Sequence, residues 1–280
     1  MNLEASYQYC SQVAKNEAKN FYYGFLPLPK DKRRGLYALY AFMRHCDDLA
    51  DDPHQDKKNM LDSWRALTVK ALEGHQSDAP QMPALVDCLE RFQIPQHYIF
   101  ELIDGVEMDL HIQRYNTFTD LYQYCYRVAS VVGLCCLYIY GFDDPQAKRI
   151  AIDCGIAFQL TNILRDIKED AARNRIYLPL EDLERFGYKE DELMKGVTND
   201  AFIALLSYEV TRAKSYFENG FKLINMVHRD SRSALRTLIS IYQKLLEKIN
   251  KNKGSILQER IQLSQTEKIW ILMRSFISKI

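Results

Sequence analysis

Residues 36–52 have the sequence LYALYAFMRHCDDLADD, in which an apolar run is followed, after Arg44-His45-Cys46, by a segment with four aspartates. The apolar residues from Leu36 to Met43 recur at the spacing of one helix face, which predicts a helix packed in a core. Asp47 and Asp51 are four positions apart, so they project from the same face of that helix and repel one another. Negative charge is also unfavourable at the carboxyl end of a helix. The stretch therefore predicts a core helix whose acidic end needs a counter-ion.

A second stretch repeats this arrangement. Residues 159–170 read QLTNILRDIKED, where Asp166 and Asp170 are again four positions apart. Gln159, Asn162 and Asp166 share one stripe of a helix, and the rest of that stripe is apolar. Polar groups in such a setting are costly unless they find partners. We expect the two acidic helix ends to face one cleft.

The remaining sequence predicts an all-α protein, a helical bundle in a single domain over residues 1–280. No strand-like alternation persists, no linker divides the chain, and Pro and Gly fall mostly between periodic segments. The segments 122–140 and 151–165 are apolar on nearly all faces, which is typical of helices in the middle of a bundle. Helices are predicted at residues 3–20, 31–51, 57–73, 82–93, 95–112, 117–140, 145–170, 198–227, 231–251 and 264–277.

Composition excludes several classes of protein. The 280 residues carry 37 Lys and Arg against 37 Asp and Glu, which argues against a nucleic-acid partner. A hydrophobic content of 47% excludes a disordered chain. The seven cysteines form no C-x-x-C pair, and no signal peptide is expected at the amino terminus, so we expect a cytoplasmic protein. Peripheral contact with a membrane through the amphipathic residues 268–276 is a hypothesis.

The paired carboxylates indicate a metal–diphosphate site. Mg²⁺ takes carboxylate oxygens, keeps several waters and shares its remaining coordination positions with substrate phosphates. Mn²⁺ is an alternative ion of the same kind. Arg44 and Arg165 lie next to the acidic pairs and add planar donors for phosphate. Spacings for an EF-hand, a zinc site, a P-loop or a dinucleotide-binding glycine motif are all missing from the sequence.

Several motifs together resemble the squalene/phytoene synthase family, the head-to-head prenyltransferases. They are Phe21 with the following Leu-Pro segment, residues 40–51, the stretch YCYRVASVVG at 124–133, residues 159–170, and RIYLP at 175–179. The resemblance covers about residues 15–250 and implies a helical bundle of the isoprenoid synthase type with a central cavity. Two departures from common family patterns are Asn20, where Ser usually precedes the Phe, and Ser130, where many members have Gly.

The resemblance implies a set of site residues. Those expected to hold Mg²⁺ are Asp47, Asp48, Asp51, Asp166, Glu169 and Asp170. Those expected to bind or orient diphosphate are Arg44, Gln159, Asn162, Arg165, Arg175 and Tyr177. Those expected near the reacting carbons are Phe21, Tyr40, Tyr124 and Arg165. The small residues Ala41, Ala129, Gly133, Gly155 and Ala157 are candidates for shaping the cavity floor.

The resemblance also implies the reaction, the joining of two prenyl diphosphates at their C1 ends. The short chain and the form of residues 126–130 look most like bacterial presqualene diphosphate synthases, which use two farnesyl diphosphates, and no NADPH is then expected. Alternatives are squalene or dehydrosqualene from the same substrates, or phytoene from two geranylgeranyl diphosphates. Enzymes that act downstream in the same pathway are candidate partners.

Two alternatives come from other classes of protein. Head-to-tail prenyltransferases and terpene cyclases also pair acidic helices, but their usual motifs differ from residues 162–170. A non-catalytic helical scaffold subunit would keep the fold without the chemistry. Intact carboxylates in both stretches argue against that scaffold.

Overall fold

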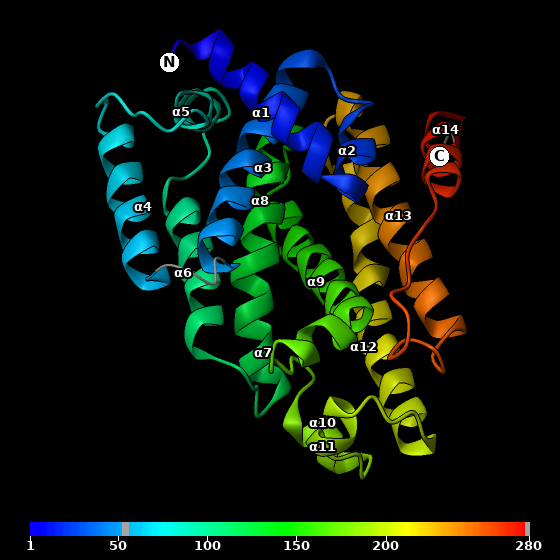
Figure 1. The fold of residues 1–280 in the computed structure, drawn as a ribbon. Helices are drawn as coiled ribbons and strands as arrows, with labels where there is room; N and C mark the ends of the chain where they lie inside the picture. Colours follow the sequence, from blue (N-terminus) through cyan, green and yellow to red (C-terminus); the bar gives the residue numbers. More distant parts are fainter. Residues whose placement is uncertain (52–55, 278–280) are drawn as a thin grey trace.

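The computed structural model describes residues 1–51 and 56–277, which fold as an assembly of helices (Figure 1). The helices are α1 Leu3–Glu17, α2 Lys19–Phe25, α3 Lys30–Asp51, α4 Lys57–Leu72, α5 Met82–Arg91, α6 His97–His111, α7 Phe118–Cys125, α8 Val131–Tyr140, α9 Gln146–Ala172, α10 Leu180–Arg185, α11 Glu190–Met194, α12 Asp200–Met226, α13 Arg232–Lys251 and α14 Gln265–Ile277. A π-helical turn, η1 (Tyr126–Ser130), joins α7 to α8, and a 3₁₀ turn, η2 (Arg229–Ser231), precedes α13. Within the described ranges no strand forms, so the all-α prediction is confirmed.

The predicted helices agree with the observed ones to within a few residues at most ends, with three differences. The predicted helix 3–20 is two helices that meet at Ala18, where the sequence contains no Pro or Gly as a stop signal. The predicted helix 117–140 contains the turn η1. Helices α10 and α11 were not predicted, because five or six residues are too few for a periodic pattern. The single domain over residues 1–280 stays a prediction.

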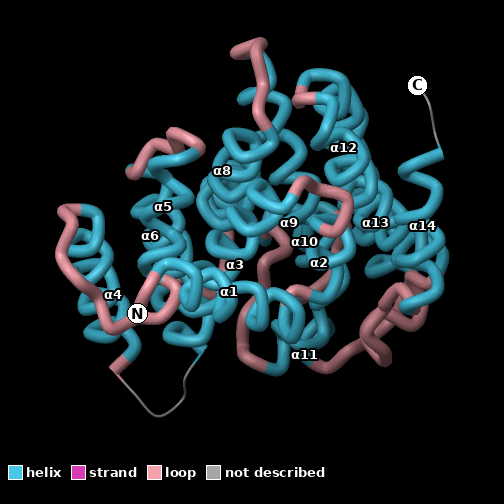
Figure 2. The backbone as a smooth tube through the Cα atoms, turned by 90° about the horizontal axis from the view of Figure 1, so that it is seen from above, coloured by secondary structure: helices cyan, strands magenta, loops and turns pink. Residues whose placement is uncertain are grey.

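Helix α9 lies in the middle of the bundle and packs against α12, α8 and η1 (Figure 2). It buries residues on nearly all of its faces, as its sequence predicts. Its approach to η1 depends on Gly155, where a Cβ atom would lie 2.5 Å from the Cα of Ser130. Ser130 itself is buried and donates a hydrogen bond to the carbonyl of Ile152 at 2.8 Å. Ser130, which stands where many family members have Gly, is therefore accommodated in the contact between η1 and α9.

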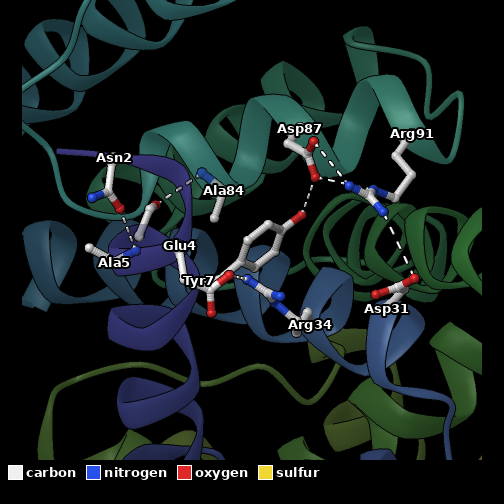
Figure 3. A network of polar contacts seen from close by, with 10 residues as sticks. Asn2, Glu4, Ala5, Tyr7, Asp31, Arg34, Ala84, Asp87 and Arg91 are labelled. Carbon is white, nitrogen blue, oxygen red and sulfur yellow. Dashed lines mark hydrogen bonds and ion pairs between the residues drawn. The ribbon is translucent and has the colours of Figure 1, made fainter.

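A polar network fastens the amino-terminal helix to the bundle (Figure 3). The Tyr7 hydroxyl donates to Asp87 of α5 at 2.6 Å, and Arg91 donates to the same carboxylate. The Arg34 guanidinium of α3 lies over the Tyr7 ring at 4.2 Å and pairs with Glu4 at 2.6 Å. These contacts hold α1 against α3 and α5, next to the short helix α2 that carries Phe21.

One end of the bundle is closed by contacts between helix termini that are distant in sequence. The Lys32 ammonium, near the start of α3, donates to the Tyr140 carbonyl at 2.8 Å and to Asp230 at 2.7 Å. The Ser231 hydroxyl donates to the same carbonyl at 2.8 Å. Gly141 has φ +77°, and a Cβ atom there would collide with the His228 ring. The chain thus reverses tightly between α8 and α9 at this closed end.

The last helix, α14, packs against α13 and α2. Its outward side exposes four large apolar side chains, Ile269, Trp270, Met273 and Phe276. None of the helices in the described ranges is long and apolar enough to span a bilayer.

Candidate active site

A cavity of about 440 Å³ runs through the bundle. Most of its wall comes from α2, α3, α6, α8, α9 and α13, with the turn η1 and the segment 260–263, and single residues of α1, α7, α12 and α14 complete it. Charged and amide side chains gather where α3 and α9 carry their acidic stretches, and most of the remaining lining is apolar. The arrangement suits a ligand with an anionic head and a long hydrocarbon tail.

Helix α3 brings Tyr40, Met43, Arg44 and Asp47 to the cavity wall. The spacing of these residues explains this placement, because they recur at three and four positions on one helix face. Asp48 lies off that face, pairs with Arg44 and is 52% exposed. Asp51 ends α3, and its side chain lies outside the described part of the chain. The structure therefore places Asp47, but not Asp48, at the cavity.

Helix α9 contributes Gln159, Asn162 and Arg165 to the wall. These positions follow one another at a spacing of three, so they form one polar row along the helix. Asp166 was predicted to continue the stripe of Gln159 and Asn162. It lies beside the cavity lining instead, where its carboxylate pairs with the neighbouring Arg165 guanidinium.

A carboxylate that the sequence motifs did not reveal, Asp109 of α6, lines the cavity. It accepts hydrogen bonds from the Tyr124 hydroxyl at 3.0 Å and from the Tyr177 hydroxyl at 2.8 Å. Arg175 donates to the Asp109 backbone carbonyl at 3.1 Å. Burial, and then the charge of Asp109, raise the pKa values of both tyrosines, so both hydroxyls keep their protons. Asp109 thus joins three residues that were predicted separately.

Arg260 is a second residue that sequence reasoning missed. Its guanidinium pairs with Asp166 at 2.7 Å and lies 3.8 Å from a Glu169 oxygen. It also lines the cavity. The arginine stands in an irregular segment between α13 and α14, so no helical spacing links it to the acidic stretch. Only folding brings it to α9.

Aromatic rings line the cavity next to the charged groups. Phe21 lies 6.3 Å from Tyr40 and 5.8 Å from Tyr242, measured between ring centroids. Tyr242 of α13 stacks on Phe158 of α9 at 4.2 Å. Burial raises the pKa of Tyr40 to about 12, so this ring stays neutral. Neutral aromatic faces attract a cation through the ring quadrupole without reacting with it.

The donor set at the charged end fits a hard cation that keeps part of its water shell. Burial, and then the like charges of Asp166 and Asp109, raise the pKa of Asp170 to about 7. The Asn162 Oδ1 and Glu169 Oε2 atoms are buried and accept no hydrogen bond from the described residues. No three His, Cys, Asp or Glu side chains in the described ranges are arranged to hold one ion. Mg²⁺ does not require such a cage, because one or two carboxylates, waters and phosphate oxygens complete its coordination.

A family model described as squalene/phytoene synthase matches residues 14–267. The chain belongs to the squalene/phytoene synthase family. The chain is 39% identical to a 15-cis-phytoene synthase of Synechocystis sp., over 97% of this chain and 84% of that protein. It is 33% identical to the chloroplastic phytoene synthase 2 of Solanum lycopersicum, over 96% of this chain and 89% of that protein.

Solved structures of the squalene/phytoene synthase family share the fold. A dehydrosqualene synthase in complex with a ligand superposes with a TM-score of 0.90 at 31% identity, over 98% of this chain and 96% of that one. The squalene synthase HpnC from Alicyclobacillus acidocaldarius superposes with a TM-score of 0.84 at 28% identity, over 90% and 95% of the two chains. Membership of this family of head-to-head prenyltransferases disfavours the head-to-tail and cyclase alternatives.

The cavity brings together most of the residues that the family resemblance implied. Phe21, Tyr40, Tyr124, Arg44, Gln159, Asn162 and Arg165 line it directly. Tyr177 and Arg175 contact Asp109, which lines the cavity. Asp166 and Glu169 contact Arg260, which also lines it. Among the small residues, Ala129, Gly133 and Gly155 line the wall, whereas Ala41 and Ala157 are absent from the lining. The roles of all these side chains in metal and substrate binding stay predictions.

Proposed function

We propose that this protein condenses two geranylgeranyl diphosphates head to head into phytoene and releases diphosphate. The observation that carries the proposal is the single cavity that joins the arginines and carboxylates of α3 and α9 to a long apolar wall. Diphosphate suits the first part of this cavity, and an isoprenoid tail suits the second.

The first step asks the protein to stabilise a leaving group. Ionisation of an allylic diphosphate leaves a carbocation and a highly charged anion. Arg44 and Arg165 line the cavity and present planar donors to that anion. Mg²⁺, when bound by the carboxylates of α3 and α9, neutralises further charge on the diphosphate.

The second task is to protect the cation until it reacts. Phe21, Tyr40 and Tyr242 present neutral rings to the cavity near the charged groups. The surrounding apolar wall keeps water, which would quench the cation, away from it. The C2=C3 bond of the second substrate then attacks C1 of the first, which leaves a cation at C3 of the second substrate. Loss of a proton from C1 of the second substrate, with the released diphosphate as its acceptor, closes the ring and gives a cyclopropylcarbinyl diphosphate. A second ionisation rearranges this intermediate, and loss of a proton forms phytoene without a reductant.

The choice of phytoene over presqualene diphosphate rests on the curated relatives. The proteins with 39% and 36% identity over nearly the whole chain are named phytoene synthases. Squalene and dehydrosqualene synthases appear among the solved structures, at 28% and 31% identity. The relatives therefore favour the geranylgeranyl alternative over the presqualene reaction expected from the sequence motifs.

Product identification tests the proposal. The purified protein is incubated with Mg²⁺ and either farnesyl or geranylgeranyl diphosphate, with and without NADPH, and the products are analysed by mass spectrometry. Phytoene from geranylgeranyl diphosphate without NADPH is expected. A cyclopropyl diphosphate that accumulates from farnesyl diphosphate would restore the presqualene reaction. No turnover of either substrate would favour the scaffold alternative.

A peripheral membrane contact through α14 is part of the same proposal. Ile269, Trp270, Met273 and Phe276 form its exposed apolar face. The Arg274 guanidinium lies over the Trp270 ring at 4.7 Å. A basic residue beside such a face suits an anionic lipid surface. Flotation with vesicles that contain anionic lipid is expected to carry the protein, and a Trp270→Ser, Phe276→Ser double variant is expected to stay behind. Wild-type protein that does not float would refute the contact.

A further inference from the structure

The cavity extends along α9 from a charged end to an apolar end. Arg165 lies at the charged end of α9, and Ala151, near the start of the same helix, also lines the wall. Fourteen residues separate them, so the wall extends about 21 Å along the helix axis. An isoprenoid tail whose diphosphate lies beside Arg165 therefore points towards the start of α9 and the end of α8.

Tyr140, the last residue of α8, lies at that far end. It lines the cavity together with Leu137 of its own helix, Leu36 of α3 and Leu235 of α13. Only 2% of Tyr140 is exposed. Its hydroxyl is buried and makes no hydrogen bond with any described residue. The ring therefore contributes bulk to the wall, and the hydroxyl contributes no bond that holds it there.

The backbone of Tyr140 is fixed instead. Its carbonyl accepts hydrogen bonds from the Lys32 ammonium and from the Ser231 hydroxyl, each at 2.8 Å. Lys32 also pairs with Asp230 at 2.7 Å. The following residue, Gly141, reverses the chain against His228. Three chain segments thus meet behind the ring and leave it little freedom to retreat from a longer ligand.

We propose that the Tyr140 ring is the floor that limits the length of the isoprenoid tail this enzyme accepts. This inference rests on the proposed prenyltransferase function. It names the residue that sets the selectivity of the same cavity for substrate length. A geranylgeranyl tail exceeds a farnesyl tail by one isoprene unit, so the position of one aromatic ring is enough to separate substrates that differ by one unit. Packed interiors resist the addition of even one methylene, which makes a fixed ring a sharp limit.

Substitution of Tyr140 tests the floor. Tyr140→Ala removes the ring, and Tyr140→Leu is a milder variant for the case in which the alanine variant is unstable. Tyr140→Phe is the matched control, because it keeps the ring and removes only the unpartnered hydroxyl. The three variants and the wild type are compared on farnesyl, geranylgeranyl and farnesylgeranyl diphosphates, the last being one isoprene unit longer. Circular dichroism and thermal melting monitor the fold.

For Tyr140→Ala or Tyr140→Leu we expect kcat/KM on the longest substrate to rise at least tenfold relative to geranylgeranyl diphosphate. Tyr140→Phe is expected to keep the wild-type selectivity and to melt no lower than the wild type, since a buried hydroxyl without a partner costs free energy. Wild-type selectivity in a folded Tyr140→Ala or Tyr140→Leu variant would overturn the inference.

A binding measurement separates failure of the floor from failure of the proposed function. Non-hydrolysable diphosphate analogues of the three tail lengths are titrated into wild type and variants by calorimetry. If the wild type has no activity but the variants gain affinity for the longest analogue, the floor stands and the proposed reaction falls. If all variants bind the three analogues in the wild-type order, the floor falls whether or not the enzyme is active.

Discussion

The acidic ends of α3 and α9 share a sequence pattern but differ in their surroundings. On α3, Asp48 is 52% exposed, and its partner Arg44 is one helical turn away on the same helix. On α9, the Asp166 side chain is 19% exposed and is paired both with Arg165 and with Arg260 from a distant segment. Two acidic helix ends of similar sequence therefore differ: Asp48 on α3 is mostly open to solvent, whereas Asp166 on α9 is held by two arginines. The counter-ion expected from the sequence is supplied at α9 by the protein itself.

The difference suggests separate tasks. On α3, the Asp48 carboxylate is exposed to solvent and Asp47 lines the cavity. On α9, Asp166 must release an arginine before it binds an ion, and that arginine can then turn to a diphosphate. Four experiments test this contrast, from the largest expected effect to the smallest.

The first experiment removes one predicted metal ligand from each helix. Asp47→Asn and Asp166→Asn are each expected to lower kcat by about 10³-fold, because each removes charge that helps to stabilise the departing diphosphate. Steady-state kinetics on the substrate identified above measures the loss. Circular dichroism shows whether each variant is folded. Full activity in either folded variant would contradict the assignment of that helix to the site.

The second experiment breaks the contact between Arg260 and α9. Arg260→Ala is expected to lower kcat/KM about tenfold or more, which is the scale of one lost hydrogen bond to a charged group. Arg260→Lys keeps the charge but loses the planar fork, and we expect it to restore part of the activity. If the alanine variant keeps the kinetics of the wild type, the pairing with Asp166 is incidental.

The third experiment concerns the metal. Thermal melting in EDTA, in Mg²⁺, and in Mg²⁺ with inorganic diphosphate compares binding to the two acidic stretches without turnover. At a hundredfold excess over Kd, a ligand adds about 2.7 kcal/mol to the free energy of unfolding, so a rise of several degrees in Tm is expected for Mg²⁺ with diphosphate. The rise should shrink in both Asp47→Asn and Asp166→Asn. An equal Tm in all three solutions would count against a metal–diphosphate site.

The smallest effect is expected at Asp48. Its pair with Arg44 spans one turn of an exposed helix end, and such pairs contribute about 0.3–0.5 kcal/mol. Asp48→Asn is therefore expected to change kcat/KM less than fivefold and to leave Tm nearly unchanged. A loss comparable to that of Asp47→Asn would show that Asp48 shares the metal site and that the two carboxylates act together.

The helices and their polar rows were largely predictable from the sequence. Of the predicted stripe Gln159, Asn162 and Asp166, the first two residues line the cavity, because residues three apart on one helix are neighbours in any fold. Arg165, one position before Asp166, completes the row at the wall. The turn η1 was not predictable in the same way. Its five residues, Tyr126–Ser130, include no Gly or Pro, and its packing depends on Gly155 of another helix.

Asp109 and Arg260 were missed for a related reason. Asp109 lies near the end of α6 and outside every acidic motif, and it acquires its place when the Tyr124 and Tyr177 hydroxyls donate to it. Arg260 is separated by 94 residues from Asp166, to which it donates. Spacing rules reach a few helical turns, whereas both contacts join segments that meet only in the folded bundle.

The sequence by itself determined the all-α class, the acidic ends of two helices and the family of the protein. Periodicity and local motifs can be recognised along the chain without knowledge of the tertiary structure. Only the tertiary structure decided which carboxylates are neutralised, which small residues line the cavity and where the cavity ends. Those properties depend on distances between helices. A linear pattern fixes the face on which a side chain lies, but not the partner that the face will meet.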